Sequence, residues 1–430
     1  MSALLDSLTS AAATDRAEPA WLRDARAEAL RSLQAEGLPT PRNEAWKYTA
    51  LRALEARRFA VPNGETSAAI DKSTLALPGI NGPRLVFVNG IFNAGLSSVG
   101  DLPAGLSLAT LAQELRTNPE PLRFLLTRHY AGRGEAFARL NTALAGDGVL
   151  LRVAAGTRVQ APVHLVHVGA PAQGDVAWAL RHLVELGQGS ALTLIEHHLG
   201  DANAHFGNLV SQFSLQAGAR LQLVQLQEAA SAATLVRRTE FDLGEDARVE
   251  AATLELGGAL VRHDVQARMR GARAHWNSRG CFSLGGRQHV DTQLDVRHEA
   301  RDTSCDIFWR GLADQRARGV FRGAITIAAG ADGSAAALSN KNLLLSPHAE
   351  IDTQPVLEIY ADEVQASHGA TVGQLDERAM FYLRSRGLPQ AQARAMLIAA
   401  FCRETLDGIA DTTLREHLAE RLLAHLPTEG

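Results

Sequence analysis

The chain has 430 residues, 46% of them hydrophobic, and a formal net charge of −4. That length leaves room for two or three domains with an ample buried core. The charge balance excludes a strongly basic nucleic-acid-binding protein, and no stretch approaches the ~18 apolar residues of a membrane span. The opening MSALLDSLTSAAATDRAEP has no basic segment before an apolar run, which argues against a signal peptide.

Cysteine usage and missing motifs narrow the class of protein further. Cys281, Cys305 and Cys402 are odd in number and scattered, which fits a reducing cytoplasm rather than a disulfide framework or a zinc site. The chain has no Gly-Lys pair and hence no Walker-type phosphate loop, and H-E-x-x-H and G-x-S-x-G are also absent. We therefore expect a cytoplasmic protein that is not a P-loop nucleotide hydrolase, a zincin or an α/β-hydrolase.

The N-terminal part of the chain predicts helices with short strands. EPAWLRDARAEALRSLQAEGLP, residues 18–39, has Pro19 where a helix can begin and Gly37 where it can end. RNEAWKYT follows, and then a loose connection over 62–83 that is rich in Pro, Gly, Ser and Asn. PRLVFVNGIFN predicts a strand, an Asn-Gly turn and a second short strand. Helical patterns resume between residues 107 and 145.

From residue 149 to residue 365 the sequence changes to short apolar runs broken by small turn residues. Runs such as VLLRVAAGTRV, APVHLVHVG and ARLQLVQLQ are each about one strand long, and no helical stretch separates them. Small-Ala-polar turns align on Ala191, Ala219, Ala247, Ala272 and Ala300, whose sequence numbers differ in turn by 28, 28, 25 and 28. A repeat of that period favours a stacked β-helix, and a β-sandwich with coincidental turn spacing is the alternative.

The C-terminal part predicts three helices. Asp376 precedes the first, Pro389 begins the second, and Asp411 precedes a third in which leucines recur every four residues from Leu414 onward. The end strands of a β stack carry unpaired backbone groups, and we expect these helices to cover the C-terminal end. The predicted domains are an N-terminal helical domain with short strands over 1–148, a β-helix core over 149–370, and a C-terminal helical domain over 371–430.

One long segment resembles a known family. LEIYADEVQASHGATVGQLDERAMFYLRSRGL, residues 357–388, closely resembles the C-terminal signature of the SufB/SufD scaffold proteins of iron–sulphur cluster assembly. RNEAWKYT, RGVFRGAITI and SNKNLLL match other blocks of that family in the same order. The residues of the SHGATVG and NEAWKYT segments favour the SufD branch of the family over the SufB branch.

This resemblance implies a mostly β protein with a right-handed parallel β-helix core flanked by N- and C-terminal α-helical domains, in agreement with the repeat. It also implies a non-catalytic scaffold subunit in a complex with a SufB-like subunit and a SufC-like ABC ATPase. An iron–sulphur cluster would then form transiently where the two scaffold chains meet. We expect no nucleic-acid or membrane partner, and a homodimer is the alternative assembly.

The resemblance assigns His368 as a metal ligand, because His368 occupies the position of a cluster-ligating histidine in the family's signature. Ala366 stands where many relatives have a cysteine, and Asn340 stands where the SufB branch carries its scaffold cysteine. Since 368 minus 340 is 28, we expect Asn340 one coil below His368, about 5 Å away. A cluster needs several thiolate ligands. We therefore expect the ligands that His368 lacks to belong to another chain.

The resemblance further implies that the C-terminal helices dock the ATPase, through FYLRSRGLPQAQARAMLIAAF. Phe381, Tyr382, Arg384 and Arg386 suit such an interface, where arginine and aromatic residues are enriched. The alternative is a plain amphipathic helix that only covers the protein's own core.

Other candidate ligands are better interpreted as structural residues. Two histidine pairs occur, His164/His167 and His197/His198. Side chains an odd number of positions apart point to opposite faces of a strand, so the two rings of either pair cannot bind one metal ion from a single strand. The spacing of Cys281 and Cys305 is close to one coil, since 305 minus 281 is 24, so they could approach each other. Small buried hydrophobes are nevertheless the favoured interpretation of these two cysteines.

Two functions compete with the scaffold. A carbohydrate-active β-helix enzyme would use paired carboxylates and aromatic platforms, yet only 5% of the residues are aromatic. A purely structural spacer would stabilise the complex without binding iron, and nothing in the sequence excludes it. The acids that could mimic a lyase site are interpreted as solvated outward positions on strands; they are Glu350, Asp352, Glu358, Asp362 and Glu363.

Overall fold

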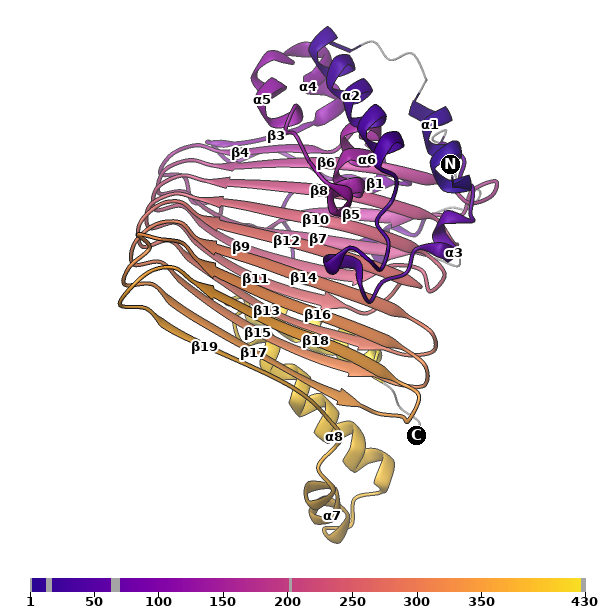
Figure 1. Cartoon of the computed structure of the whole chain (residues 1–430), viewed down its shortest axis with the longest axis vertical. Coiled ribbons are helices and arrows are strands. Elements are labelled where there is room, and N and C mark those ends of the chain that lie inside the picture. Colours follow the sequence, from indigo (N-terminus) through magenta and orange to yellow (C-terminus); the bar gives the residue numbers. More distant parts are fainter. Residues whose placement is uncertain (1, 13–17, 63–69, 201–202, 427–430) are drawn as a thin grey trace.

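The structure is a computed structural model that describes residues 2–12, 18–62, 70–200 and 203–426. The chain forms a parallel β-solenoid that carries helices from both of its terminal regions (Figure 1). The predicted fold class, a mostly β protein with a parallel β-helix core and flanking helices, is confirmed. No helix in the described ranges is long and apolar enough to cross a membrane.

Each coil of the solenoid contributes one strand to each of two sheets, here called sheet I and sheet II. Sheet I contains β1 (Arg84–Val88), β2 (Ile91–Phe92), β5 (Val163–Gly169), β7 (Ala191–Gly200), β9 (Arg220–Glu228), β11 (Arg248–Glu255), β13 (His275–Leu284), β15 (Ser304–Ala313), β17 (Ala335–Leu344) and β19 (Gln365–Gly373). Sheet II contains β3 (Leu106–Thr110), β4 (Val149–Val153), β6 (Ala177–Leu186), β8 (Phe206–Leu215), β10 (Thr234–Leu243), β12 (Leu260–Met269), β14 (His289–His298), β16 (Arg318–Ile327) and β18 (Glu350–Ile359). The coils pair in parallel, while β1–β2 and β3–β4 are antiparallel.

The repeat period was predicted correctly, but its register was wrong at three turns. The residues that share one buried position directly before a strand are Ser190, Ala219, Ala247, Ala274 and Thr303. The predicted alignment used Ala191, Ala272 and Ala300, which are one, two and three residues away from this shared position. Turns of unequal length cause the drift, and three of them contain a non-glycine residue with positive φ: Asp246, Arg273 and Asp302.

The core lies between the two sheets, and both outer faces are also largely covered. On β9, Leu221 and Leu223 point into the core, whereas Val224 and Leu226 belong to a second apolar cluster on the outside of sheet I. Strands buried on both faces produce near-continuous apolar runs rather than strict alternation. This explains the sequence texture between residues 149 and 340.

The N-terminal helices pack against the outer face of sheet II (Figure 1). They are α1 (Ala3–Ala12), α2 (Ala20–Glu36), α3 (Arg52–Glu55), α4 (Leu111–Thr117), α5 (Arg123–Leu126) and α6 (Ala136–Leu144). The predicted helix at 18–37 is confirmed, with Gly37 at φ 73° where it ends. Helix was also predicted from residue 107, but β3 occupies 106–110 because its alternating side chains complete the first edge of sheet II. Short 3-10 turns occur at Glu44–Trp46, Lys72–Leu75, Glu120–Leu122, Arg133–Glu135 and Glu404–Leu406.

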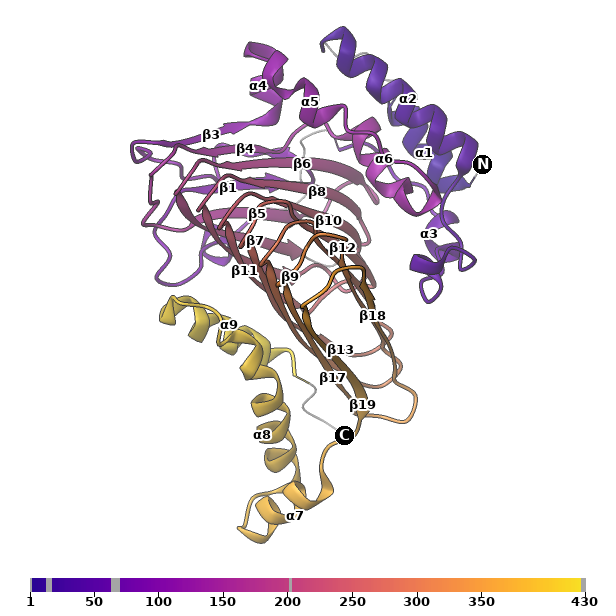
Figure 2. The same ribbon diagram turned by 60° about the vertical axis from the view of Figure 1, so that its left-hand side comes forward.

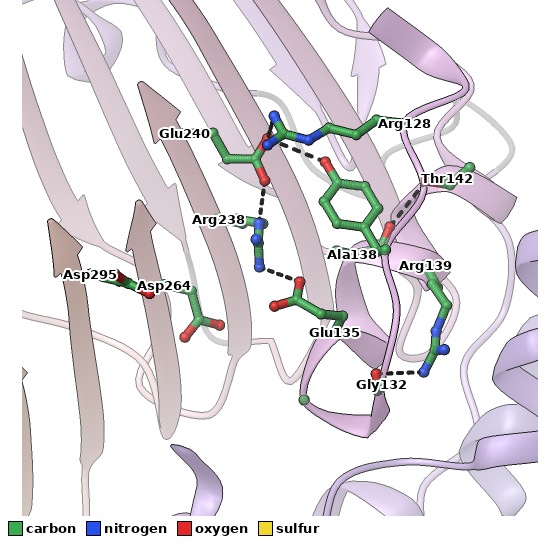
Figure 3. A network of polar contacts seen from close by, with 12 residues as sticks. Arg128, Gly132, Glu135, Ala138, Arg139, Thr142, Arg238, Glu240, Asp264 and Asp295 are labelled. Carbon is green, nitrogen blue, oxygen red and sulfur yellow. Dashed lines mark hydrogen bonds and ion pairs between the residues drawn. The ribbon is translucent and has the colours of Figure 1, made fainter. Parts of the chain in front are cut away.

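A charged network joins the N-terminal helices to sheet II, as Figure 3 shows. The guanidinium of Arg238 on β10 lies between the carboxylates of Glu240 and Glu135, at 2.5 Å from each. Arg128 binds the other oxygen of Glu240 at 2.7 Å. Because Arg238 and Glu240 are both largely buried, these pairs fix the orientation of the helical region on the solenoid.

The NEAWKYT segment extends this attachment toward the last coil. Trp46 is buried, stacks on Phe137 with ring centroids 5.4 Å apart, and carries the guanidinium of Arg262 4.2 Å from its ring centroid. At the start of the segment, Gln354 on β18 donates to Glu44 at 3.3 Å. The segment is therefore a strap that runs along the outside of sheet II, and Tyr48 is only half-buried in it.

The C-terminal helices do not cover the end of the solenoid as predicted. They are α7 (Glu377–Ser385), α8 (Gln390–Arg403) and α9 (Thr412–Ala424). Figure 2 shows α8 and α9 running back beside sheet I, where Ile398, Leu414 and Leu418 pack on its outer face. Arg421 on α9 binds Glu228 on β9 at 2.6 Å. The helices pack on this face because the outside of sheet I is apolar. They therefore do not cover the last coil.

Candidate functional site

The last coil, β18 and β19, ends the solenoid without a neighbouring strand. Both strands stand at the ends of their sheets, so each has one outer edge of backbone N–H and C=O groups with no partner strand among the described residues. Seven of the ten residues of β16 are buried, but only one of the ten on β18. Ile359, Tyr360 and Val372 are 43%, 64% and 42% exposed. The last coil therefore has exposed apolar side chains and unpaired strand edges, as an interior coil would have if the next coil were missing.

His368 lies on this open coil. It pairs with Leu338 of β17, whose side chain is buried in the core between the sheets. Paired residues of parallel strands share a face, so His368 points toward the open end of the solenoid interior. His368 is exposed, and within the described ranges its ring makes no hydrogen bond or ion pair. The site therefore presents one exposed imidazole at the open end of the solenoid.

Asn340 does not lie beneath His368 as the spacing predicted. It pairs with Ala370, because the offset between paired residues of β17 and β19 is 30 (370 − 340) rather than 28. Its side chain is fully buried, accepting hydrogen bonds from Asn342 at 2.6 Å and from Thr353 at 2.7 Å. Asn342 also donates to the Thr371 carbonyl at 3.1 Å. Asn340 is thus a buried, hydrogen-bonded polar residue one coil below the open end of the solenoid.

The first C-terminal helix projects away from the solenoid. On α7, Phe381 is 75% exposed and Tyr382 is 57% exposed, and the guanidinium of Arg386 lies 5.2 Å from the Tyr382 ring centroid. Arg384 and Phe381 line a groove between α7, α8 and the turn after β17. The carboxylate of Asp376 caps the helix by accepting from the Arg378 N–H at 2.8 Å. The structure thus holds an exposed aromatic and cationic surface on a well-defined helix.

The two histidine pairs point to opposite faces within each strand, as predicted, but they meet across coils. His167 pairs in register with His198, and their rings stack with centroids 4.6 Å apart. The Nε2 atoms of His167 and His182 are 2.9 Å apart. Burial lowers the pKa of His182 to about 3 and that of His167 well below its ordinary range, so both rings stay neutral near pH 7. No group of three or more His, Cys, Asp or Glu in the described ranges has the geometry of a metal site.

Cys281 and Cys305 do not approach each other. Cys305 pairs with Trp276 and points into the core, where its sulphur lies 3.3 Å from Nε2 of His298. Cys281 points to the outer face of sheet I, where it belongs to the same apolar cluster as Cys402 on α8. Cys281 pairs with Arg310, an offset of 29 (310 − 281), so the spacing of 24 falls short of a full coil here. That Cys281 and Cys402 share one cluster was not predicted, since only the fold brings α8 onto the outer face of sheet I.

The acids of the last coil are solvated, as predicted. Glu350, Glu358, Asp362 and Glu363 are exposed, and Asp352 is half-buried. Arg318 neutralises Glu350 at 3.0 Å and Asp352 at 2.9 Å. These contacts are those of a solvent-facing ion-pair network.

Two family models match nearly the whole chain. The model for the SufBD core domain, described as SUF system FeS cluster assembly, matches residues 168–401, and the model for the SufBD protein N-terminal region matches residues 8–165. This chain belongs to the SufBD family. The resemblance inferred from the 357–388 signature is confirmed.

Individual SufBD relatives agree with this assignment. The iron–sulphur cluster assembly protein SufD of Escherichia coli (strain K12) is 31% identical over 403 residues, which cover 93% of this chain and 92% of that protein. A SufBD family protein of Synechocystis is 30% identical over 407 residues, 93% of this chain and 89% of that protein. SufD of Bacillus subtilis (strain 168) is 26% identical over 422 residues, 93% of each chain. The prediction of the SufD branch of the family is confirmed.

Proposed function

We propose that this SufBD family member is a non-catalytic scaffold subunit for iron–sulphur cluster assembly. It pairs through its last coil with a second, SufB-like solenoid and presents His368 to a nascent cluster at that junction. It also docks a SufC-like ABC ATPase through α7 and α8. The cluster is the cargo of this assembly, passed on after it forms.

The open last coil is the observation that carries this proposal. Unpaired strand edges are costly when exposed, and proteins either cover them or use them to add strands from a partner. Here the chain's own C-terminal helices lie on the face of sheet I instead of on these edges. A second solenoid could continue both sheets and cover Ile359, Tyr360 and Val372.

The position of His368 supports its role as an incomplete ligand set. Its ring would lie between two stacked solenoids, at the end of the interior rather than on an outer face. Imidazole is a good ligand for iron, but a cluster requires several ligands, most often thiolates. This coil offers no cysteine, since Ala366 stands two residues before His368. The partner would therefore supply the thiolates.

A test of the ligand role uses the complex reconstituted from this chain, a SufB-like chain and a SufC-like ATPase. His368→Ala should leave the complex intact and lower the iron and sulphide bound per complex. His348→Ala is the matched control, because His348 is also exposed but lies on a turn outside β19. Equal cluster loading in the His368→Ala complex and in wild type would refute the ligand role and favour the structural spacer.

A second test addresses ATPase docking. Phe381→Ala combined with Tyr382→Ala should weaken co-elution with the ATPase, because both side chains are exposed on α7 and their loss costs the fold little. Phe124→Ala is the control: Phe124 is 88% exposed on α5, in the N-terminal region away from α7 (Figure 1). If both variants co-elute like wild type, α7 is not the docking helix. A carbohydrate-active enzyme would show no co-elution with the ATPase at all.

A further inference from the structure

A cavity lies between α2, the segment after α5, and α6, on the outer side of sheet II. Its volume is about 70 Å³, whereas one water molecule needs about 10–15 Å³, so the cavity has room for a small polyatomic ion. Its exposed rim includes Thr127 and His129, and its buried wall includes Tyr130, Arg139 and Thr142. A ligand could therefore enter from solvent and reach buried polar groups.

A guanidinium behind this wall has no carboxylate partner. Arg181 on β6 is 2% exposed, and it forms no ion pair with any of the described residues. Its Nη2 donates to the hydroxyl groups of two residues that line the cavity, Tyr130 at 3.3 Å and Thr142 at 3.5 Å. Its Nε has no hydrogen-bond partner in the described part of the chain. Buried cations are normally paired with an anion, because an unpaired one loses its hydration without compensation.

Arg139 brings a second buried guanidinium to the cavity itself. It is 2% exposed, and it binds Glu36 at 2.7 Å and the Gly132 carbonyl at 2.9 Å. Because the Glu36 side chain is 37% exposed, solvent weakens that pair. The Nε of Arg139 is buried and has no partner among the described residues. Its N–H is therefore a donor that a bound ligand could satisfy.

The charged groups around the cavity carry an excess of positive charge. Arg128 also lines the cavity and shares Glu240 with Arg238, as Figure 3 shows. Glu28 on the rim adds no net charge, because it is paired with Arg31 at 2.6 Å. One positive charge remains when the other guanidiniums are set against the other carboxylates, which are Arg128, Arg139, Arg181 and Arg238 against Glu36, Glu135 and Glu240.

We propose that this cavity binds a phosphate group, with the inorganic phosphate ion as the fitting ligand. Guanidinium groups are preferred binders of phosphate, because their N–H donors match its oxygens and their charge compensates its own. Glu28 lines the same cavity and uses two of its about four lone-pair sites for Arg31 and Ser32, so it can still accept from a P–OH group. Sulphate has no such hydrogen near neutral pH and would only be repelled by Glu28. The site should therefore prefer phosphate to sulphate.

A bound phosphate would connect α2, the segment over 127–130 and α6, since residues of all three line the cavity. A ligand that binds only the folded state stabilises it by mass action, so phosphate should raise the unfolding temperature. This inference is independent of His368 and of the proposed partner subunits.

The first test is isothermal titration calorimetry of the full-length protein in a phosphate-free buffer. Wild type should bind one phosphate ion, and it should bind sulphate about tenfold more weakly, the effect of one lost hydrogen bond to a charged group. Glycerol 3-phosphate distinguishes the source of the group, since tighter binding than that of inorganic phosphate would identify a phosphorylated small molecule as the occupant. If wild type binds neither inorganic phosphate nor glycerol 3-phosphate, the proposal is overturned.

Arg181→Met removes the unpaired cation and leaves an apolar side chain in its place. The variant should bind phosphate about tenfold more weakly, because a charge close to the ligand is lost in a poorly solvated place. Phosphate should also raise its unfolding temperature less than that of wild type. Arg152→Met is the matched control, because Arg152 also lies on sheet II but pairs with Glu185 at 2.5 Å and does not line this cavity. Equal phosphate affinities of Arg181→Met and wild type would overturn the proposal.

Glu28→Gln is the second variant, and it should fold normally because Glu28 is exposed. The glutamine amide can donate to any oxyanion and carries no charge, so the preference for phosphate over sulphate should disappear. A preference equal to that of wild type would overturn the proposal, and this outcome decides the matter even if Arg181→Met fails to fold. Circular dichroism checks the folding of each variant.

Discussion

Replacing Arg262 by methionine tests how the strap is held on the solenoid. Arg262 is 1% exposed, and its guanidinium contacts Asp291 at 2.5 Å, Asp264 at 2.7 Å and the Ala45 carbonyl at 2.7 Å. It also covers the ring of Trp46. The variant removes all of these contacts together and leaves the buried carboxylate of Asp291 without a cation.

The expected cost is large because the pair is buried. Removing one partner of a buried ion pair costs about 3–5 kcal/mol, since the remaining charge is left uncompensated. Arg270→Met is the control: Arg270 binds Asp242 at 3.2 Å but is 52% exposed, and exposed pairs contribute about 0–1 kcal/mol. Combining Arg262→Met with Asp291→Leu should recover part of the loss, because no buried charge then remains unpaired.

Urea unfolding measures these costs, and hydrogen exchange over residues 41–60 shows whether the strap detaches first. We expect a clear drop in the unfolding midpoint and faster exchange in the strap for Arg262→Met alone. Equal midpoints for Arg262→Met and Arg270→Met would contradict the reasoning. So would a double variant that is less stable than the single one.

Three further predictions concern stability. Gly280→Ala should destabilise the protein by about 1–3 kcal/mol, seen as a lower thermal unfolding temperature, because the added methyl would lie 2.5 Å from the Trp309 indole. Gly285→Ala is the control and should have little effect, because no atom lies within 4 Å of the added methyl. Burial lowers the pKa of His182 from 6.5 to about 3, so its contribution to stability is complete above pH 6.5 and decreases as the pH falls toward 3. The urea midpoint should therefore be lower at pH 5 than at pH 7, and His182→Gln should lessen that difference; an equal difference in the variant would count against this cause. Asp411→Ala should lower the free energy of unfolding by about 1 kcal/mol and speed hydrogen exchange over 412–424, because the Asp411 side chain caps α9. Unchanged exchange over these residues would show that the cap is dispensable.

The fold was largely predictable because its causes are local and repeated. Strand-length apolar runs and recurrent turns predicted the stacked coils, and Pro19 and Gly37 predicted the limits of α2. What failed was register. Turns of unequal length shift the pairing from coil to coil, and this moved Asn340 from beneath His368 to beneath Ala370. A spacing in sequence therefore predicts which coil a residue occupies, but not which residue faces it.

The contacts made between elements could not be predicted from local pattern. The burial of Cys281 and Cys402 in one cluster depends on the outer face of sheet I being apolar enough to bind α8. For the same reason the C-terminal helices lie on a face instead of over the last coil. The position of His368 came from resemblance to a family signature, and its open surroundings became visible only in the structure.

The most direct measurement of the central claim is pulsed electron paramagnetic resonance on the cluster-loaded complex, reduced to a paramagnetic state, with ¹⁵N-histidine in this chain alone. A ¹⁵N coupling to the cluster should be present, and it should disappear in His368→Ala. A loaded cluster with no ¹⁵N coupling, or a coupling that survives the substitution, would contradict the claim that this chain contributes His368 to a ligand set completed by its partner.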